Sequence, residues 1–167
     1  MSESAGRGAV RVCLETQRLI LETPGQAARE WSVSTARNGA GEQLGSERTP
    51  RGRHVIRARI GAGLPPGAVL VGRRPTGEIW TPELARHHPL RDWILTRILW
   101  LSGLEPGFNR LGPVDSMRRF IYIHGTPDTE PMGVPLSHGC VRMRNEDVID
   151  LFDRVRPGTP VTIEETA

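Results

Sequence analysis

Residues 120–144 read FIYIHGTPDTEPMGVPLSHGCVRMR and contain the most informative residues of the chain. Cys140, one of two cysteines, directly follows Gly139 and lies two residues after His138. A second histidine, His124, lies sixteen residues before the cysteine, at the end of an alternating apolar run. A thiol needs a nearby base to attack a carbonyl, because its unperturbed pKa of about 8.5 keeps it mostly protonated at neutral pH. This stretch therefore predicts a cysteine nucleophile.

Two histidines can supply the base, and the residue types alone leave the choice open. In an extended backbone the side chain of His138 could share a face with that of Cys140, because side chains alternate along a strand. His124 could be brought over the thiol by antiparallel pairing of its strand. Both arrangements would give a thiol–imidazole pair.

The residues around the cysteine suit acyl transfer. Gly139 would let the backbone turn tightly and the substrate come close, because no side chain stands beside the nucleophile. The backbone amides of residues 138–140 could donate to the oxyanion of an acyl-transfer intermediate. Arg142, two residues beyond the cysteine, is placed to bind a substrate carboxylate.

Three interpretations without catalysis stay open at this point. The sequence SHGC at residues 137–140 could be a loop with a buried thiol. His124, His138 and Cys140 could bind zinc, but no fourth ligand or closely paired ligand spacing is evident, so we expect no metal and no cofactor. A redox-sensing thiol would need a resolving partner, and no motif around Cys13 suggests one.

The composition predicts one mainly β domain over residues 1–167. A chain of 167 residues can build one good core. Its 19 glycines and 14 prolines, with few long apolar periods, favour strands joined by many turns. Cys13 falls in an alternating apolar run and is expected to be a small buried residue of a strand.

The charged residues are compatible with an anionic substrate and do not favour a nucleic acid. All 22 basic residues are arginine, for a net charge of +3. Arginine binds carboxylates and phosphates through a planar fork. The arginines are spread along the chain and form no single stripe, so we do not expect nucleic acid as a partner.

The N-terminal sequence predicts a cytoplasmic protein. Residues 1–21 contain no charged region followed by an apolar core and a small-residue cleavage site. No run approaches the roughly 20 apolar residues that span a bilayer, so we expect no membrane association. Both cysteines are then expected to be reduced thiols. The oligomeric state is not predicted.

The apolar pattern predicts eight strands and one helix. The expected helix follows the cysteine, with Asn145 as its N-cap and one apolar stripe of Val148, Leu151, Phe152 and Val155. We expect residues 39–53 to be an exposed loop and residues 73–91 to be a connection. The strand at residues 93–101 is expected to be buried on both faces. The other expected strands are residues 10–14, 18–22, 30–35, 54–60, 69–72, 119–125 and 161–164.

The motifs at the cysteine resemble those of a known enzyme family. IHGT at residues 123–126, followed by SHGCVRM at residues 137–143, closely resembles the signature of YkuD-type L,D-transpeptidases. The resemblance extends upstream through STARNG at residues 34–39 and TPRG at residues 49–52, and covers nearly the whole chain.

This resemblance implies a β-sandwich catalytic domain that acts on the stem tetrapeptide of peptidoglycan. Family members attack the carbonyl of the L-centre of the third residue, commonly diaminopimelate, and expel D-alanine. By resemblance Cys140 is the nucleophile, His124 the general base and acid, and the carbonyl of Gly125 orients the imidazole. Ser137, His138 and Gly139 would shape the pocket and the oxyanion site, and Arg142 would meet the substrate. The resemblance also implies acylation by carbapenems.

The acceptor of the acyl group separates two expected activities. Water would make the protein an L,D-carboxypeptidase that trims recycled muropeptides, and the absence of a recognisable export signal favours this hypothesis. An amine acceptor would make it an L,D-transpeptidase that cross-links peptidoglycan. A different hypothesis is a non-catalytic thiol protein that binds murein or a metal.

Overall fold

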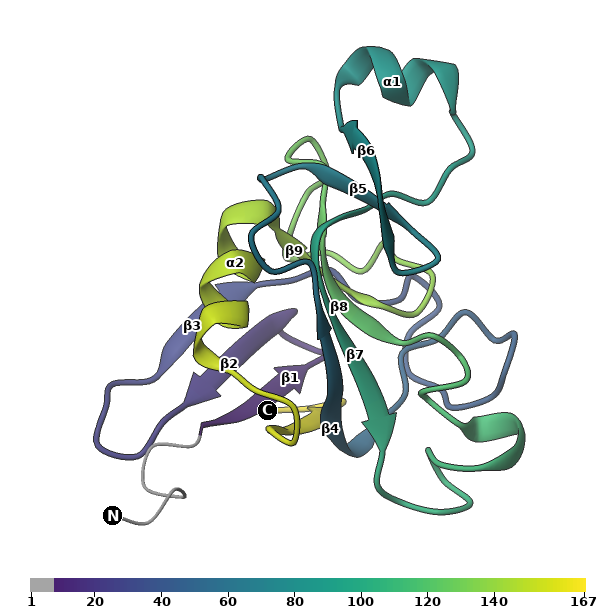
Figure 1. Ribbon diagram of the computed structural model, residues 1–167. Coiled ribbons are helices and arrows are strands. Elements are labelled where there is room, and N and C mark those ends of the chain that lie inside the picture. The colour runs from purple at the N-terminus through teal and green to yellow at the C-terminus, as the bar shows by residue number, and fades with distance from the viewer. Residues whose placement is uncertain (1–7) are drawn as a thin grey trace.

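A computed structural model describes residues 8–167 and confirms the mainly β fold (Figure 1). Residues 1–7 of the predicted domain lie outside the described part. Two α-helices, α1 (Pro82–His87) and α2 (Asn145–Arg154), and a short 3₁₀ turn (Gly112–Val114) accompany the strands of residues 8–167. The strands are β1 (Ala9–Cys13), β2 (Arg18–Glu22), β3 (Arg29–Ser32), β4 (Gly52–Ile60), β5 (Ala68–Val71), β6 (Arg74–Ile79), β7 (Ile94–Gly103), β8 (Tyr122–Thr126), β9 (Val141–Arg144) and β10 (Pro160–Glu164).

The strands form one curled, branched sheet. Its main path runs β3-β2-β1-β10-β4-β7-β5-β6, and β8 and β9 branch from β7. The C-terminal β10 lies between β1 and β4 and runs parallel to β1, with Val161 opposite Val10. Strand β7 is the centre of the sheet because it pairs with β4, β5 and β8. As predicted, its middle is buried on both faces.

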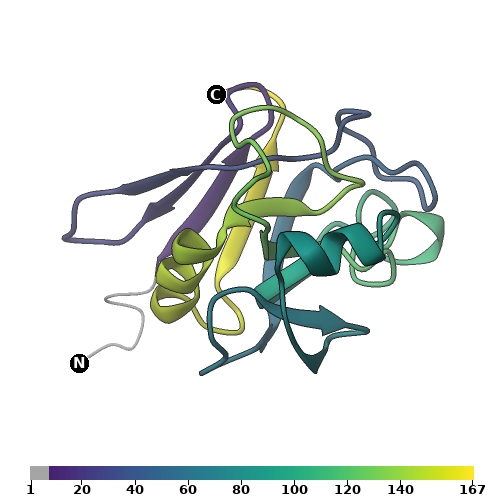
Figure 2. The same ribbon diagram turned by 90° about the horizontal axis from the view of Figure 1, so that it is seen from above.

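The main core lies between the curled sheet and α2. The apolar stripe predicted for the helix is buried there: Val148, Leu151, Phe152 and Val155 are at most 3% exposed. Burying each such side chain stabilises the fold by roughly 1.5–3 kcal/mol. Figures 1 and 2 both show α2 lying along the sheet, close to β9. The cysteine thus directly precedes β9, which leads into a helix packed on the main core.

The prediction of Asn145 as the helix N-cap is wrong. The cap position belongs to Arg144, which makes no side-chain capping bond, and Asn145 is the first helical residue. The Asn145 side chain instead contacts buried Thr96 of β7 and Asp128. The sequence favoured Asn145 as the N-cap because asparagine often caps the helix that follows it. Here its contacts with Thr96 and Asp128 determine its position instead.

Two further predicted segments need correction. Residues 73–91, expected to be a connection, contain β6 and α1, and α1 is capped by Thr81, whose hydroxyl accepts from the amide of Leu84. The strand predicted for residues 119–125 begins only at Tyr122. Phe120 has a φ of +57° and is 52% exposed, so it cannot continue the strand. The hairpin β5–β6 and α1 project together at one end of the molecule (Figure 1).

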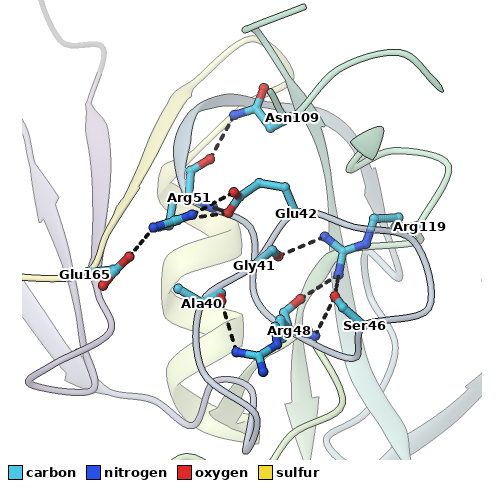
Figure 3. A network of polar contacts seen from close by, with 9 residues as sticks. All are labelled: Ala40, Gly41, Glu42, Ser46, Arg48, Arg51, Asn109, Arg119 and Glu165. Atoms are coloured by element: carbon cyan, nitrogen blue, oxygen red, sulfur yellow. Dashed lines mark hydrogen bonds and ion pairs between the residues drawn. The ribbon is translucent and has the colours of Figure 1, made fainter. Parts of the chain in front are cut away.

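Residues 39–53 are, as predicted, mostly an irregular and partly exposed loop, which ends where β4 begins at Gly52. A polar network holds this loop in place (Figure 3). The guanidinium of Arg51 pairs with Glu42 at 2.8 Å and also with Glu165 near the C-terminus. Arg119 donates to the carbonyl oxygens of Gly41 and Arg48 and to the hydroxyl of Ser46. We call residues 39–53 the anchored segment. Within residues 8–167, no helix is both long and apolar enough to cross a membrane.

Candidate active site

Parallel pairing of β8 with β9 brings the predicted histidine and cysteine to one cavity. Ile123 lies opposite Val141, and His124 lies opposite Arg142. The antiparallel pairing expected from sequence is therefore wrong, although the two residues do meet. The cavity has a volume of about 530 Å³, and both His124 and Cys140 line it, together with Ser137, His138 and Arg142.

His124 is buried and held in one orientation. Its exposed fraction is 1%, and its Nδ1 lies 2.6 Å from the carbonyl oxygen of Gly125. A carbonyl can only accept, so Nδ1 carries the proton and Nε2 keeps a lone pair. Burial lowers the pKa of His124, and the hydrogen bond to Gly125 opposes this only in part. The ring is therefore a neutral base at neutral pH.

Gly125 occurs where no other residue fits. A Cβ atom at this position would lie 2.5 Å from the carbonyl oxygen of Leu95 and 2.5 Å from Oδ1 of Asn145. Thr96 donates to that same Oδ1 at 2.6 Å, and its φ of +74° is rare for a β-branched residue. This buried contact between β7 and α2 fixes the strand end that orients His124. No sequence signal indicated Thr96.

Cys140 is half-buried in the cavity wall as a neutral thiol. Its sulfur lies 3.3 Å from the carbonyl oxygen of Phe120 and 3.4 Å from the amide nitrogen of Tyr122. Burial raises the pKa of Cys140 to about 12, although the Tyr122 amide acts in the opposite direction. This favours a neutral thiol over a thiolate–imidazolium pair, so attack by Cys140 would require transfer of its proton to a base.

The loop of residues 137–140, which we call the cysteine loop, is fixed by hydrogen bonds. Ser137 donates through its hydroxyl to the carbonyl oxygen of Cys140 at 2.6 Å. The same hydroxyl accepts from the amide of Gly139 at 3.2 Å, so this amide is engaged within the loop. Gly139 has a φ of +133°, which is accessible mainly to glycine and agrees with the predicted tight turn.

Thr49 of the anchored segment holds the cysteine loop from outside. It is fully buried, and its hydroxyl donates to the carbonyl oxygen of Gly139 at 2.9 Å. The same hydroxyl accepts from the amide of Ala36 at 3.0 Å. The TPRG motif includes this residue, but its contact with the cysteine loop was not predicted.

Arg142 lies on the cavity wall but is already paired. Its guanidinium is 3.1 Å from Asp92, and its side chain is only 11% exposed. Nδ1 of His138 lies 3.8 Å from the same carboxylate, and this side chain is 57% exposed. Asp92 was not identified from sequence, because it lies 50 residues from Arg142, in the link just before β7, and no local pattern joins the two. Among residues 8–167, no three His, Cys, Asp or Glu side chains are arranged to hold a metal ion.

The fold and the cavity define a mainly β protein that brings a thiol and an oriented imidazole together. A family model for the L,D-transpeptidase catalytic domain (YkuD) matches residues 7–163 of this chain. The chain belongs to the L,D-transpeptidase catalytic-domain family, as its motifs suggested.

Individual relatives agree with this membership. The probable L,D-transpeptidase YbiS of Escherichia coli K12 is 35% identical over 98 residues, which cover 54% of this chain and 29% of that protein. The match therefore spans less than a third of that relative. The structure of Bd1075 from Bdellovibrio bacteriovorus superposes with a TM-score of 0.60 at 18% identity, covering 99% of this chain and 50% of that one. The L,D-transpeptidase LdtMt1, solved in complex with imipenem, gives 0.55 at 15% identity, with coverages of 95% and 59%. At such identities the structural similarity concerns the fold.

Proposed function

We propose that the protein is a cysteine acyltransferase that acts on peptidoglycan stem tetrapeptides. The observation that carries this proposal is the cavity in which Cys140 lies with His124, whose ring is oriented by the carbonyl of Gly125. Family membership supports the substrate class. The acyl donor is the carbonyl at the L-centre of the third residue, and the leaving group is D-alanine.

In the first half of the proposed reaction, Sγ of Cys140 bonds to the donor carbonyl carbon while its proton passes to Nε2 of His124. The tetrahedral intermediate collapses as the carbon–nitrogen bond breaks, and His124 returns the proton to the departing amine of D-alanine. This leaves a thioester on Cys140 and a neutral imidazole. The lowered pKa of His124 supports this role, because it keeps Nε2 unprotonated before attack.

In the proposed reaction His138 is not the base. Its exposed ring faces Asp92 and carries no bond that would orient it toward the thiol. This favours His124 as the base and leaves His138, Ser137 and Gly139 to shape the pocket. The amide of Tyr122, which already contacts the sulfur, is an additional donor near the reacting atoms.

We propose water as the default acceptor, which makes the protein an L,D-carboxypeptidase. Cys140 is half-buried at the cavity wall, so solvent can approach the thioester. His124 then takes a proton from water, hydroxide adds to the thioester carbonyl, and the tripeptide leaves with a new carboxylate as the thiol regains its proton.

One observation favours the alternative of cross-linking. A second cavity of about 270 Å³ shares Asp92, His138 and Arg142 with the first. It could hold an amine acceptor on the far side of the Arg142–Asp92 pair. In that case the amine nitrogen attacks the thioester carbonyl, its proton passes through His124 to the departing sulfur of Cys140, and a new peptide bond forms.

Product analysis with a tetrapeptide muropeptide tests the proposal. Purified protein is expected to release D-alanine and tripeptide, and Cys140→Ala should reduce the rate to that of buffer. Cys13→Ala is the matched control, because this second thiol is buried in β1 and should leave turnover unchanged. If cross-linked dimers were the only product, the protein would be an L,D-transpeptidase and the carboxypeptidase proposal would be wrong. Binding of muropeptide without any product would support a non-catalytic murein-binding protein.

A further inference from the structure

Three arginines line the cavity beside Cys140, and two of them are already committed. The guanidinium of Arg142 pairs with Asp92 at 3.1 Å. Arg119 donates to backbone oxygens and to Ser46 of the anchored segment (Figure 3), and none of these partners lines the cavity. To bind a substrate, either arginine would have to break these existing contacts. The third arginine, Arg73, is different.

Arg73 is held over an aromatic surface at the edge of the cavity. Its guanidinium carbon lies 4.5 Å from the ring centre of Trp100 and 5.2 Å from that of Phe120. One of its nitrogens donates to the hydroxyl of Tyr122 at 3.0 Å. Stacking covers a flat face of the guanidinium and leaves its edges available, and an arginine carries five N–H donors. Within residues 8–167, no carboxylate lies at ion-pair distance from it.

The backbone at this position is unusual for an arginine. Gly72 and Arg73 form the two-residue turn between β5 and β6, with φ values of +57° and +64°. A left-handed conformation costs a residue with a Cβ roughly 1–2 kcal/mol, which glycine or asparagine would largely avoid. Turn tips usually extend their charged side chains into water, whereas this side chain is half-buried and folded back over the cavity. A strained residue at a cavity edge is a candidate for function.

We propose that Arg73 binds a carboxylate of the substrate peptide through the free edge of its guanidinium and thereby selects substrates. This inference rests on the proposed function. Two carboxylates next to the scissile bond of a tetrapeptide have the required chemistry: the C-terminal carboxylate of D-alanine and the side-chain carboxylate of a diaminopimelate third residue. Arg73 would take the role that the sequence assigned to Arg142, whose partner is Asp92. The β5–β6 hairpin is then a part of the substrate site.

Three tetrapeptides distinguish the two carboxylates. The first contains diaminopimelate and a free C-terminus, the second replaces diaminopimelate by lysine, and the third has an amidated D-alanine. Arg73→Gln is expected to reduce kcat/KM for the first peptide by about 10- to 100-fold, mainly through KM, because a charge-assisted hydrogen bond is lost. The peptide that lacks the recognised carboxylate should be a poor substrate for the wild type and should lose nothing further in the variant. Arg73→Lys should fall between the two, since it keeps the charge without the fork.

Arg74→Gln is the matched control, because this neighbour on the same hairpin is exposed and should not affect any peptide. If Arg73→Gln reduced kcat/KM equally for all three peptides, or for none, the proposal would be wrong. Arg73 would then serve only to hold the hairpin in place. Tetrapeptide binding to the Cys140→Ala protein, with and without Arg73→Gln, separates this result from the reaction itself. Weaker binding in the double variant supports the role of Arg73 even if the wild type releases no D-alanine, whereas equal binding contradicts it.

Discussion

At the scale of single residues, the site depends on hydroxyl and carbonyl groups that hold the reacting side chains. In the proposed mechanism the carbonyl of Gly125 takes the place of the carboxylate in a Ser-His-Asp triad, and its contact orients His124 without adding a negative charge. A carboxylate there would raise the pKa of the imidazole, whereas burial beside a carbonyl lowers it. Burial of both groups keeps the thiol and the imidazole neutral, and the carbonyl partner adds no negative charge that would work against this.

Thr49 gives a prediction at the same scale. Thr49→Val keeps the shape of the side chain but removes the hydroxyl that bonds both Gly139 and Ala36. Leaving these buried groups unpaired should lower the free energy of unfolding by about 1–3 kcal/mol. Turnover of the tetrapeptide should also fall, because the cysteine loop loses its outer support. Urea unfolding and product release measure the two effects.

Thr49→Ser is the control for this substitution, since it retains the hydroxyl and should preserve most of both properties. If Thr49→Val matched the wild type in stability and in turnover, the anchored segment would have no part in holding the cysteine loop.

At the scale of elements, the site lies where buried hydrogen bonds join β8, β9 and the loops around them to the rest of the sheet. His54 of β4 makes one such set of hydrogen bonds. It is fully buried, its Nε2 accepts from the hydroxyl of Ser116 at 2.8 Å, and its Nδ1 donates to the carbonyl oxygen of Gly52 at 3.0 Å. Ser116 also accepts, through its carbonyl oxygen, from the amide of Ile121, next to β8. A neutral ring thus joins β4 to the segment that leads into the site.

Burial of His54 predicts that the stability of the fold depends on pH. Burial lowers the pKa of His54 to about 4, below the value of about 6.5 expected in the unfolded chain. Between these values the unfolded state binds more protons, so stability falls as the pH decreases. The contribution lost between pH 7 and pH 5 is about 2 kcal/mol. Buried His124, whose pKa is also lowered, acts in the same direction.

Urea unfolding of the wild type and of His54→Gln at the two pH values measures this contribution. The variant should be less stable at pH 7 but should lose clearly less stability on acidification. An unchanged difference between the two pH values in His54→Gln would show that His54 is not the titrating group.

At the scale of the whole molecule, the motifs around Cys140 and the alternation of apolar residues were enough to predict the family, the mainly β fold and the helix stripe. Contacts between distant segments were not predictable in the same way. The parallel pairing of β8 with β9, the pairing of Asp92 with Arg142 and the bond from Thr49 to Gly139 all join residues whose spacing carries no local signal. Asn145 and Phe120 were misassigned for the same reason, because tertiary partners overrode the local preference.

Acylation by imipenem tests the central claim, that Cys140 is the nucleophile of the site, most directly. LdtMt1, which has the same fold, was solved in complex with this compound. Intact-protein mass spectrometry should show one covalent adduct on the wild type and on Cys13→Ala, and none on Cys140→Ala. An adduct that persists on folded Cys140→Ala, or a wild type whose mass does not change, would contradict the assignment of Cys140 as the nucleophile.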